Sequence, residues 1–175
     1  MGEDFAGKRP VSAVRSARRG DAPAITAIYN QGIEDRIGTF ETEPRSVSEI
    51  EAWFDHAKAF VAVENSAGEV VGYAVAHPYA DRCCYAGIGE FSVYVRRDHR
   101  GAGVGRVAMN ALVDASRDSG LWKLLSRVFP ENRASLNLMA WSGFKEIGVH
   151  EKHGKLDGVW RDCVIVERLI AENVD

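Results

Sequence analysis

The sequence is poor in the features that mark membrane, secreted and nucleic-acid-binding proteins. None of its apolar runs approaches the length of about 20 residues that a membrane-spanning helix needs. The amino-terminal segment MGEDFAGKRP lacks the apolar core of a signal peptide, so we expect a cytoplasmic protein. The net charge of −3 gives no electrostatic reason to expect a nucleic acid or an anionic membrane as a partner.

Cysteine is also scarce. The chain has three cysteines, of which Cys83 and Cys84 are adjacent, and this pattern makes neither a disulfide framework nor a zinc-ligand spacing. We expect the cysteines to be small buried or half-buried residues. The residues His56, His150 and His153 show no spacing typical of metal ligands. The sequence therefore predicts no metal site.

The composition is that of an ordinary globular protein, with 46% hydrophobic and 27% charged residues. A length of 175 residues suits one domain with a full core. We expect this domain over residues 11–170, between a flexible leader at residues 1–10 and a tail at residues 171–175.

Apolar periodicity and turn residues predict the element order β-α-α-β-β-β-α-β-α-β-β. Asp21 is expected to cap the first helix, and Ser46 with Glu49 is expected to form a capping box at the second. The last two strands are expected to form an antiparallel hairpin. This order indicates an α/β fold in which helices cover a mixed sheet.

The stretch EFSVYVRRDHRGAGVGR joins an alternating strand to a helix through Gly101, Gly103 and Gly105. Such a turn gathers backbone N–H groups at the positive end of a helix dipole, which makes a phosphate site. A P-loop would need a Lys and a Ser or Thr, where Arg106 and Val107 follow. A dinucleotide fingerprint is nearly met, but it lies past mid-chain and the next strand ends without an acid. The third ligand is the pyrophosphate of coenzyme A.

This stretch resembles the acyl-CoA motif of the GNAT superfamily of N-acetyltransferases, and the element order is similar to that fold. Further segments (FETEP, HPYADRCCY, EFSVYV and GVWRD) resemble the phosphinothricin and methionine-sulfone acetyltransferases. The segments GEFSVYV, FPENRAS and HGKLDGVWRD are most similar to the arsinothricin branch. The resemblance covers about residues 13–169. It implies a mostly antiparallel central sheet that is splayed at the acyl-CoA site, with helices on both faces.

The resemblance also implies roles for residues around the glycine-rich turn. Glu90 occupies the place of the family's proposed general base, on the same face of its strand as Ser92 and Tyr94. The N–H of Val95 is expected to polarise the thioester carbonyl. Asn132 matches a cofactor position but could equally be only a helix N-cap. The expected acetyl-CoA contacts are Val93, Tyr94, Val95, Arg100, Gly101, Ala102, Gly103, Val104, Gly105, Arg106, Asn132 and Ser135.

For the amine substrate, the resemblance points to Arg82 and Tyr85, which align with an Arg and a Tyr of the phosphinothricin enzymes. An Arg fork binds carboxylates and phosphinates bidentately. The expected reaction is acetyl transfer to the α-amine of a glutamate-like amino acid of the phosphinothricin, arsinothricin or methionine sulfone or sulfoximine type. The expected substrate contacts are Phe40, Thr42, Glu43, Arg82, Tyr85 and Ser92.

Two positions depart from the pattern of the resembling families. Many relatives carry a Tyr, as acid for the leaving thiolate, where this chain has Met139; the phosphinothricin enzymes also lack that Tyr. Asp157 stands roughly where those enzymes have a His.

The segment from Lys155 to Trp160 is expected at the interface of a homodimer. The alternatives are a protein or peptide N-acetyltransferase, and a non-catalytic sensor that binds acyl-CoA.

Overall fold

The computed structural model describes residues 11–174. The predicted leader at residues 1–10 lies outside them. The strands are β1 (Val11–Ser16), β2 (Ala59–Asn65), β3 (Val70–Pro78), β4 (Ile88–Val95), β5 (Lys123–Val128), β6 (Lys145–Leu156) and β7 (Val159–Leu169). The α-helices are α1 (Ala22–Glu34), α2 (Val47–Trp53), α3 (Val104–Asp118) and α4 (Arg133–Trp141). The observed order of strands and helices is the predicted order. No helix in this part of the chain is long and apolar enough to cross a membrane.

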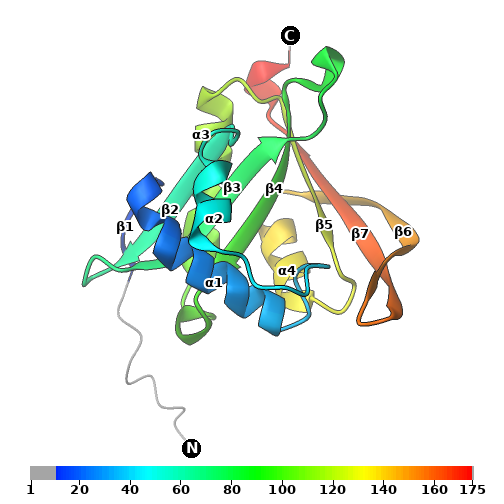
Figure 1. Ribbon diagram of the computed structural model, residues 1–175. Helices are drawn as coiled ribbons and strands as arrows, with labels where there is room; N and C mark the ends of the chain where they lie inside the picture. Colours follow the sequence, from blue (N-terminus) through cyan, green and yellow to red (C-terminus); the bar gives the residue numbers. More distant parts are fainter. Residues whose placement is uncertain (1–10, 175) are drawn as a thin grey trace, which may run out of the picture.

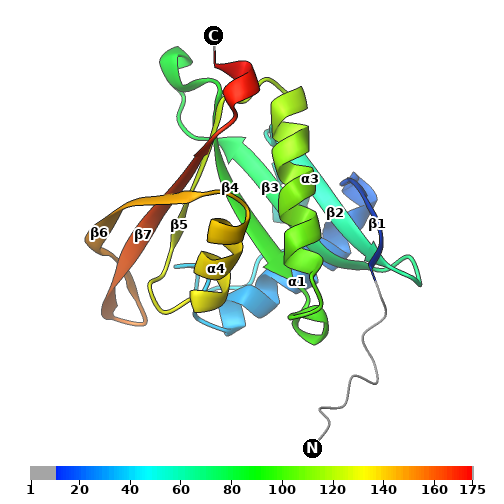
Figure 2. The ribbon, with the colours of Figure 1, turned by 180° about the vertical axis from the view of Figure 1, so that it is seen from behind.

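The strands form one sheet in the order β1-β2-β3-β4-β5-β7-β6. Only β4 and β5 run parallel; every other neighbouring pair is antiparallel. Helices α1 and α2 cover one face of the sheet, and α3 and α4 lie on the other face (Figures 1 and 2). The predicted α/β fold, with a mostly antiparallel sheet and helices on both faces, is confirmed.

The core has two layers because the central strand β3 is buried on both faces. Its Tyr73 and Val75 pack under α1 and α2, whereas Ala74 packs under α3. Side chains that alternate along a strand point to opposite faces, so a strand between two helical layers is apolar at nearly every position. The two layers hold β4, next to β3, in a fixed place.

The sheet is splayed between β4 and β5, as predicted. Their parallel pairing runs only from Ile88 opposite Lys123 to Glu90 opposite Leu125, although both strands continue beyond these residues. Figure 1 shows the two strands diverging, with α4 behind the opening, and Figure 2 shows the same opening from the α4 side. The divergence leaves one edge of β4 without a neighbouring strand.

The capping predictions had different outcomes. Ser46 and Glu49 form the predicted capping box: Glu49 N–H donates to Ser46 Oγ at 3.3 Å and Ser46 N–H donates to Glu49 Oε2 at 2.8 Å. Asp21 occupies the N-cap position of α1, as predicted, but its side chain makes no capping hydrogen bond to that helix. A short 3-10 turn, η1 (Arg19–Asp21), precedes α1, and the Asp21 carboxylate accepts hydrogen bonds from Arg18 N–H and Arg15 instead.

The burial expected of the cysteines holds only for Cys163. Cys83 and Cys84 are exposed on the 3-10 turn η2 (Cys83–Tyr85), which lies outside the sheet in the β3–β4 connection. At the end of the chain, residues Ala171–Asn173 form the turn η4. The Asn173 amide donates hydrogen bonds to the Arg117 and Leu121 carbonyls at 2.8 and 2.9 Å, and these bonds attach the turn to the domain.

Candidate active site

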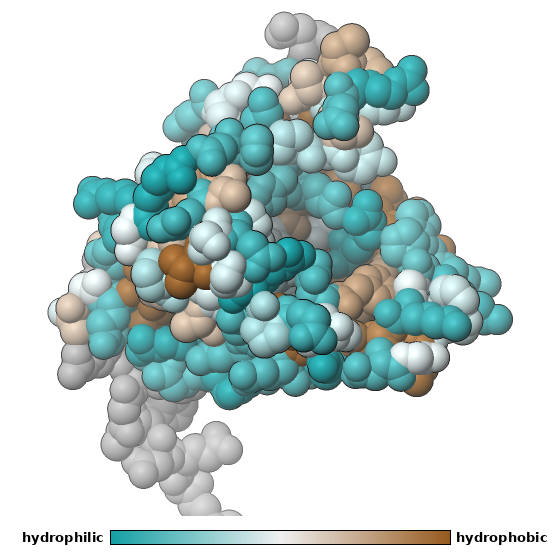
Figure 3. Space-filling model, in the orientation of Figure 1, coloured by the Kyte–Doolittle hydropathy of each residue, from teal (hydrophilic) through white to brown (hydrophobic). Residues whose placement is uncertain are grey.

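A cavity of about 600 Å³ opens where β4 and β5 diverge. It is lined by β4 from Phe91 to Val95, the β4–α3 loop, β5 and its continuation from Ser126 to Phe129, the first turns of α4 and the end of α1. Figure 3 shows this side of the molecule hollowed between the α1–α2 layer and the β6–β7 hairpin, with hydrophobic and hydrophilic residues side by side. Most of the predicted cofactor residues meet here.

The backbone of β4 presents its open edge to this cavity. The Arg96 N–H donates to the Val71 carbonyl of β3 at 2.8 Å. Because hydrogen-bonding direction alternates along a strand, the N–H groups of Val93 and Val95, which lie beyond the last pair with β5, point the other way, toward the side that β5 has left. An extended ligand with amide groups, such as the pantetheine arm of coenzyme A, could pair with this edge as a strand would.

The glycine-rich turn lies at the amino end of α3. Gly101 and Gly103 have φ values of 74° and 84°, in the left-handed region that favours glycine. A Cβ at Gly103 would meet no heavy atom within 4 Å, so the backbone conformation requires glycine there and the surface above it is open. At Gly105 a Cβ would come within 3.0 Å of Leu138 Cδ2. An open helix amino end suits a phosphate group.

The side chains of Ala102, Val104 and Arg106, which neighbour these glycines, point in different directions. Arg106 lines the cavity and its guanidinium lies 4.7 Å from the centre of the Trp141 ring on α4. Ala102 is exposed on the loop and Val104 is buried in the core, and neither lines the cavity. Of the residues predicted around the turn, the glycines, Arg100 and Arg106 are therefore the ones that face the cavity.

Arg100 is held at the cavity by Asp35. Its Nε donates to the Val95 carbonyl at 3.1 Å, and its Nη1 lies 2.5 Å from an Asp35 oxygen. Arg97 donates to the other Asp35 oxygen at 2.7 Å. Although burial opposes ionisation, the hydrogen bonds from Arg97 and Arg100 lower the pKa of Asp35 below its usual value. Asp35 is therefore ionised at neutral pH and fixes a cation beside the glycine-rich turn.

Asn132 and Ser135 line the cavity at the start of α4. The Asn132 side chain accepts a hydrogen bond from Ser135 N–H at 3.1 Å, so it is the N-cap of α4. Its Nδ2 also donates to the Ile37 carbonyl at 3.0 Å, which ties α4 to the loop after α1. The structure thus shows the capping role, and contact with a cofactor stays a prediction.

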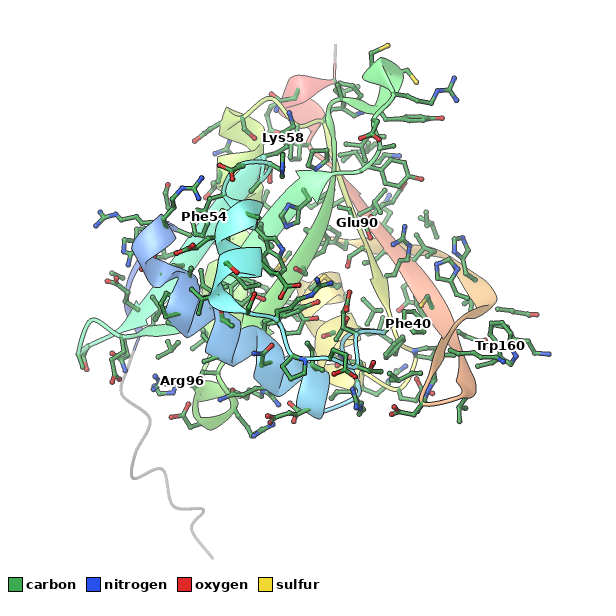
Figure 4. The ribbon with its side chains drawn as sticks, in the orientation of Figure 1. Phe40, Phe54, Lys58, Glu90, Arg96 and Trp160 are labelled. Carbon is green, nitrogen blue, oxygen red and sulfur yellow. The ribbon has the colours of Figure 1, made fainter. Side chains whose placement is uncertain are left out.

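Glu90 lies at the last position where β4 is paired with β5. Its Oε1 accepts a hydrogen bond from Arg127 Nη1 of β5 at 2.5 Å. The two side chains are about one-third exposed, 34% for Glu90 and 37% for Arg127. Arg127 lines the cavity; Glu90 does not line it itself but contacts Arg127 close to the closed end of the opening (Figure 4). A carboxylate at this point could accept a proton from an amine that enters the cavity.

Ser92 and Tyr94 follow Glu90 on the same face of β4, and both line the cavity. Tyr94 lies edge-on to Tyr29 of α1, with ring centres 5.1 Å apart, and its hydroxyl donates to the Gly38 carbonyl at 3.1 Å. Burial raises the pKa of Tyr94 well above its usual value. Tyr94 is therefore a neutral hydrogen-bond donor that connects β4 with the loop after α1.

The loop between α1 and α2 lines the cavity with Ile37 and Gly38, whereas its Phe40 does not line the cavity itself. The Phe40 ring lies edge-on to Phe129, a lining residue, with ring centres 4.8 Å apart. Phe40 thus supports an apolar wall below Glu90 (Figure 4). Thr42 and Glu43 are exposed on the same loop and do not line the cavity.

Arg82 and Tyr85 lie elsewhere. Both are exposed in the β3–β4 connection around η2, and neither lines the cavity. The Arg82 guanidinium lies 5.9 Å from the centre of the Tyr85 ring. Their role in substrate binding stays a prediction.

Met139 and Asp157, the two departures from the family pattern, have well-defined positions in the structure. Met139 is buried, at 2% exposed, and lines the cavity, so no side chain at this position can donate a proton. Asp157 and Gly158 have φ values of 49° and 79° between β6 and β7, which is the conformation of a two-residue hairpin turn. The Asp157 carboxylate pairs with Arg36 Nε at 3.2 Å. Asp157 thus occupies a position of the hairpin turn and forms an ion pair with Arg36.

Two charged residues at the cavity were not selected from the sequence. Asp35 directly follows α1, and the neighbouring residues in the sequence do not distinguish it from an ordinary solvent-exposed residue at a helix end. Arg127 stands in the strand KLLSRV at a position that alternates with Leu124, Ser126 and Val128. A long cation in a strand beside an acyl-CoA motif is a usable signal, because strands of this kind are mostly apolar.

This geometry, an open strand edge beside a glycine-rich helix start, suits the binding of an acyl-CoA. No cluster of metal-ligating side chains occurs in residues 11–174. Residues 25–144 match the model of the Acetyltransferase (GNAT) family, and the chain belongs to this family. It is an acyl-CoA-dependent N-acetyltransferase that uses acetyl-CoA.

Named relatives cover most of the chain. It is 32% identical to the L-methionine sulfoximine/L-methionine sulfone acetyltransferase of Pseudomonas paraeruginosa, over 89% of this chain and 93% of the relative. It is 36% identical to the phosphinothricin N-acetyltransferase of Alcaligenes faecalis, over 91% and 83%. The solved phosphinothricin acetyltransferase of Sinorhizobium meliloti, in complex with acetyl-CoA, superposes with a TM-score of 0.85 at 26% identity, over 93% and 90%.

Proposed function

We propose that this acetyltransferase acetylates the α-amine of a small glutamate-like amino acid of the phosphinothricin, arsinothricin or methionine sulfone or sulfoximine type. The observation that carries the proposal is the position of Glu90 at the closed end of the β4–β5 opening, where it pairs with Arg127, a residue that lines the same cavity as the glycine-rich turn. The names of the relatives support this class of substrate.

In the proposed reaction the ammonium group of the substrate first loses a proton to Glu90, directly or through a water molecule. The free amine attacks the thioester carbon, and the Val95 N–H stabilises the developing oxyanion. The carbon–sulfur bond breaks, the thiolate leaves, and the nitrogen gives up its second proton, which the thiolate takes up directly or through a water molecule. A thiol with a pKa near 8.5 leaves without a dedicated acid, which agrees with the buried Met139.

The remaining predicted substrate residues enter the proposal by resemblance. Phe40 and Ser92 flank the cavity and would contact the amino acid, and Phe40 does so through the apolar wall that it shares with Phe129. Arg82 and Tyr85 would bind an acid group of the substrate from η2, and Thr42 and Glu43 would close the loop over it.

We also propose that the enzyme is a cytoplasmic homodimer joined through the β6–β7 hairpin. Strand β6 ends the sheet, and the hairpin exposes Ile147, Val149, Val159 and Trp160, each more than half exposed. Trp160 points outward from the tip of the hairpin (Figure 4). An edge strand with exposed apolar side chains is a surface suited to a second copy. Sedimentation of the protein should give a dimer, and Trp160→Glu should give a monomer.

A substrate panel tests the proposed activity. Thiol release from acetyl-CoA should be fast with L-phosphinothricin, arsinothricin, L-methionine sulfone or L-methionine sulfoximine, and slow with peptides and simple amines. Preference for polypeptide N-termini would favour a peptide acetyltransferase. Binding of acetyl-CoA without turnover of any amine would favour a sensor.

A further inference from the structure

Arg127 occupies a place that the reaction described above does not use. It stands on β5 just after this strand leaves β4, and its side chain lines the cavity. Within residues 11–174, the only hydrogen bond of its side chain is the one from Nη1 to Glu90. A guanidinium has five N–H donors. Arg127 therefore brings a planar cation with unused donors to the same point as the proposed base.

The Glu90–Arg127 pair matches the charges of an α-amino acid. Such a substrate carries an ammonium and a carboxylate on one carbon atom, and the pair offers a carboxylate and a guanidinium in direct contact at 2.5 Å. The substrate can exchange that one ion pair for two, with its ammonium on Glu90 and its carboxylate on Arg127. The guanidinium can hold a carboxylate through two parallel hydrogen bonds.

We propose that Arg127 binds the α-carboxylate of the amino-acid substrate and selects α-amino acids over other amines. The inference rests on the proposed function, because it concerns the same cavity and the same amine. It assigns the α-carboxylate to Arg127 and leaves the distal acid group to another residue.

The surroundings of Arg127 orient such a substrate. Phe129 is the next residue on the same face of this segment, and with Phe40 it forms an apolar wall beside Arg127. A substrate held by Arg127 and Glu90 would direct its amine toward the open edge of β4 and its side chain along that wall. Arg82, exposed directly before the turn η2, does not line this cavity.

Three matched compounds test the inference: L-methionine sulfone, its α-carboxamide, and 3-(methylsulfonyl)propylamine, which lacks the α-carboxylate. The wild-type enzyme should acetylate the acid at least 30-fold better than the other two, measured as kcat/KM. Arg127→Gln should lower kcat/KM for the acid about 30-fold or more, the effect of losing one partner of a desolvated charge pair. It should change the other two compounds by less than about threefold, because they form no such pair.

Two further variants complete the test. Arg127→Lys keeps the charge beside Glu90 but loses the planar fork, so it should lose most of the preference for the acid. If Arg127→Gln does not fold, the substrate preference of Arg127→Lys still tests whether Arg127 binds the α-carboxylate. Lys123→Gln removes a cation of the same strand that pairs with Glu167 outside the cavity, at 3.0 Å. It should leave all three rates unchanged. The KM for acetyl-CoA should stay constant in every variant.

The outcomes separate the two proposals. If Arg127→Gln lowers the rates of all three compounds equally, Arg127 only positions Glu90 and the inference is overturned. If the variants keep the wild-type preference for the acid, the inference is also overturned, while the proposed function stands. A wild-type enzyme that does not prefer the acid contradicts the proposed function itself.

Discussion

Gly32 of α1 lies against the ring of Tyr94 of β4, with no room for a side chain between them. A Cβ at Gly32 would stand only 2.7 Å from Tyr94 Cδ1 and still closer to Cε1. Tyr94 lines the cavity and donates to the Gly38 carbonyl. The absence of a side chain at Gly32 therefore sets both the packing of α1 on the sheet and the shape of the cavity.

Gly32→Ala should destabilise the protein although alanine favours helices. Overpacking a core costs about 1–3 kcal/mol, which exceeds the gain of roughly 1 kcal/mol from helix propensity. Displacement of Tyr94 should also raise the KM for acetyl-CoA. Denaturant unfolding and steady-state kinetics measure the two effects. Gly20→Ala is the control, because a Cβ at Gly20 meets open space and Gly20 lies outside the proposed dimer surface. Equal stability of the two variants would contradict the tight contact.

Gly103→Ala should weaken acetyl-CoA binding specifically. Gly103 and Gly68 both have positive φ values, 84° and 76°, and at both positions an added methyl group would meet open space. Each alanine variant should therefore lose about 1–2 kcal/mol of stability from the left-handed backbone. Only Gly103→Ala places a methyl group where a phosphate would approach the start of α3, so only this variant should raise the KM for acetyl-CoA. The same KM in both variants would remove the turn from phosphate binding.

Glu90→Gln should keep acetyl-CoA binding and lose about 10²–10⁴ in kcat near neutral pH, the usual effect of removing a positioned base. The deficit should shrink at alkaline pH, because more of the amine is then already deprotonated. The pH profile of kcat measures this. Glu167→Gln is the control, since Glu167 forms a similar ion pair with Lys123 away from the cavity. A loss below about threefold at every pH would exclude Glu90 as the base.

Arg82→Ala and Arg82→Lys should both impair acetylation of phosphinothricin-type amines and leave the KM for acetyl-CoA nearly constant. Loss of a charge-assisted pair to an acid group should lower kcat/KM, and Lys cannot copy the parallel donors of Arg. Arg117→Ala, on the outer surface of α3, is the control. Unchanged kinetics in the Arg82 variants would leave Arg82 a surface residue that stacks on Tyr85.

Sequence patterns were sufficient to predict the strands and helices and the glycine-rich turn before α3. The order of strands and helices follows from apolar periods of about 2 and 3.6 residues, which each segment carries by itself. The Ser46–Glu49 capping box and the glycines at positive φ are local too, because each depends on a few neighbouring residues. The sequence placed Asp21 correctly at the start of α1, but not its capping hydrogen bond, because the carboxylate binds Arg15, which Glu64 also binds from a distant strand.

Tertiary structure decided which charges meet at the cavity. Glu90 and Arg127 are 37 residues apart in sequence, and they meet because β4 and β5 pair for three positions and then diverge. Asp35 reaches Arg100, and Phe40 reaches Phe129, only because α1 and its following loop pack beside that opening. Strand register and divergence depend on the packing of both helical layers against the sheet, and no single segment of the sequence encodes that packing.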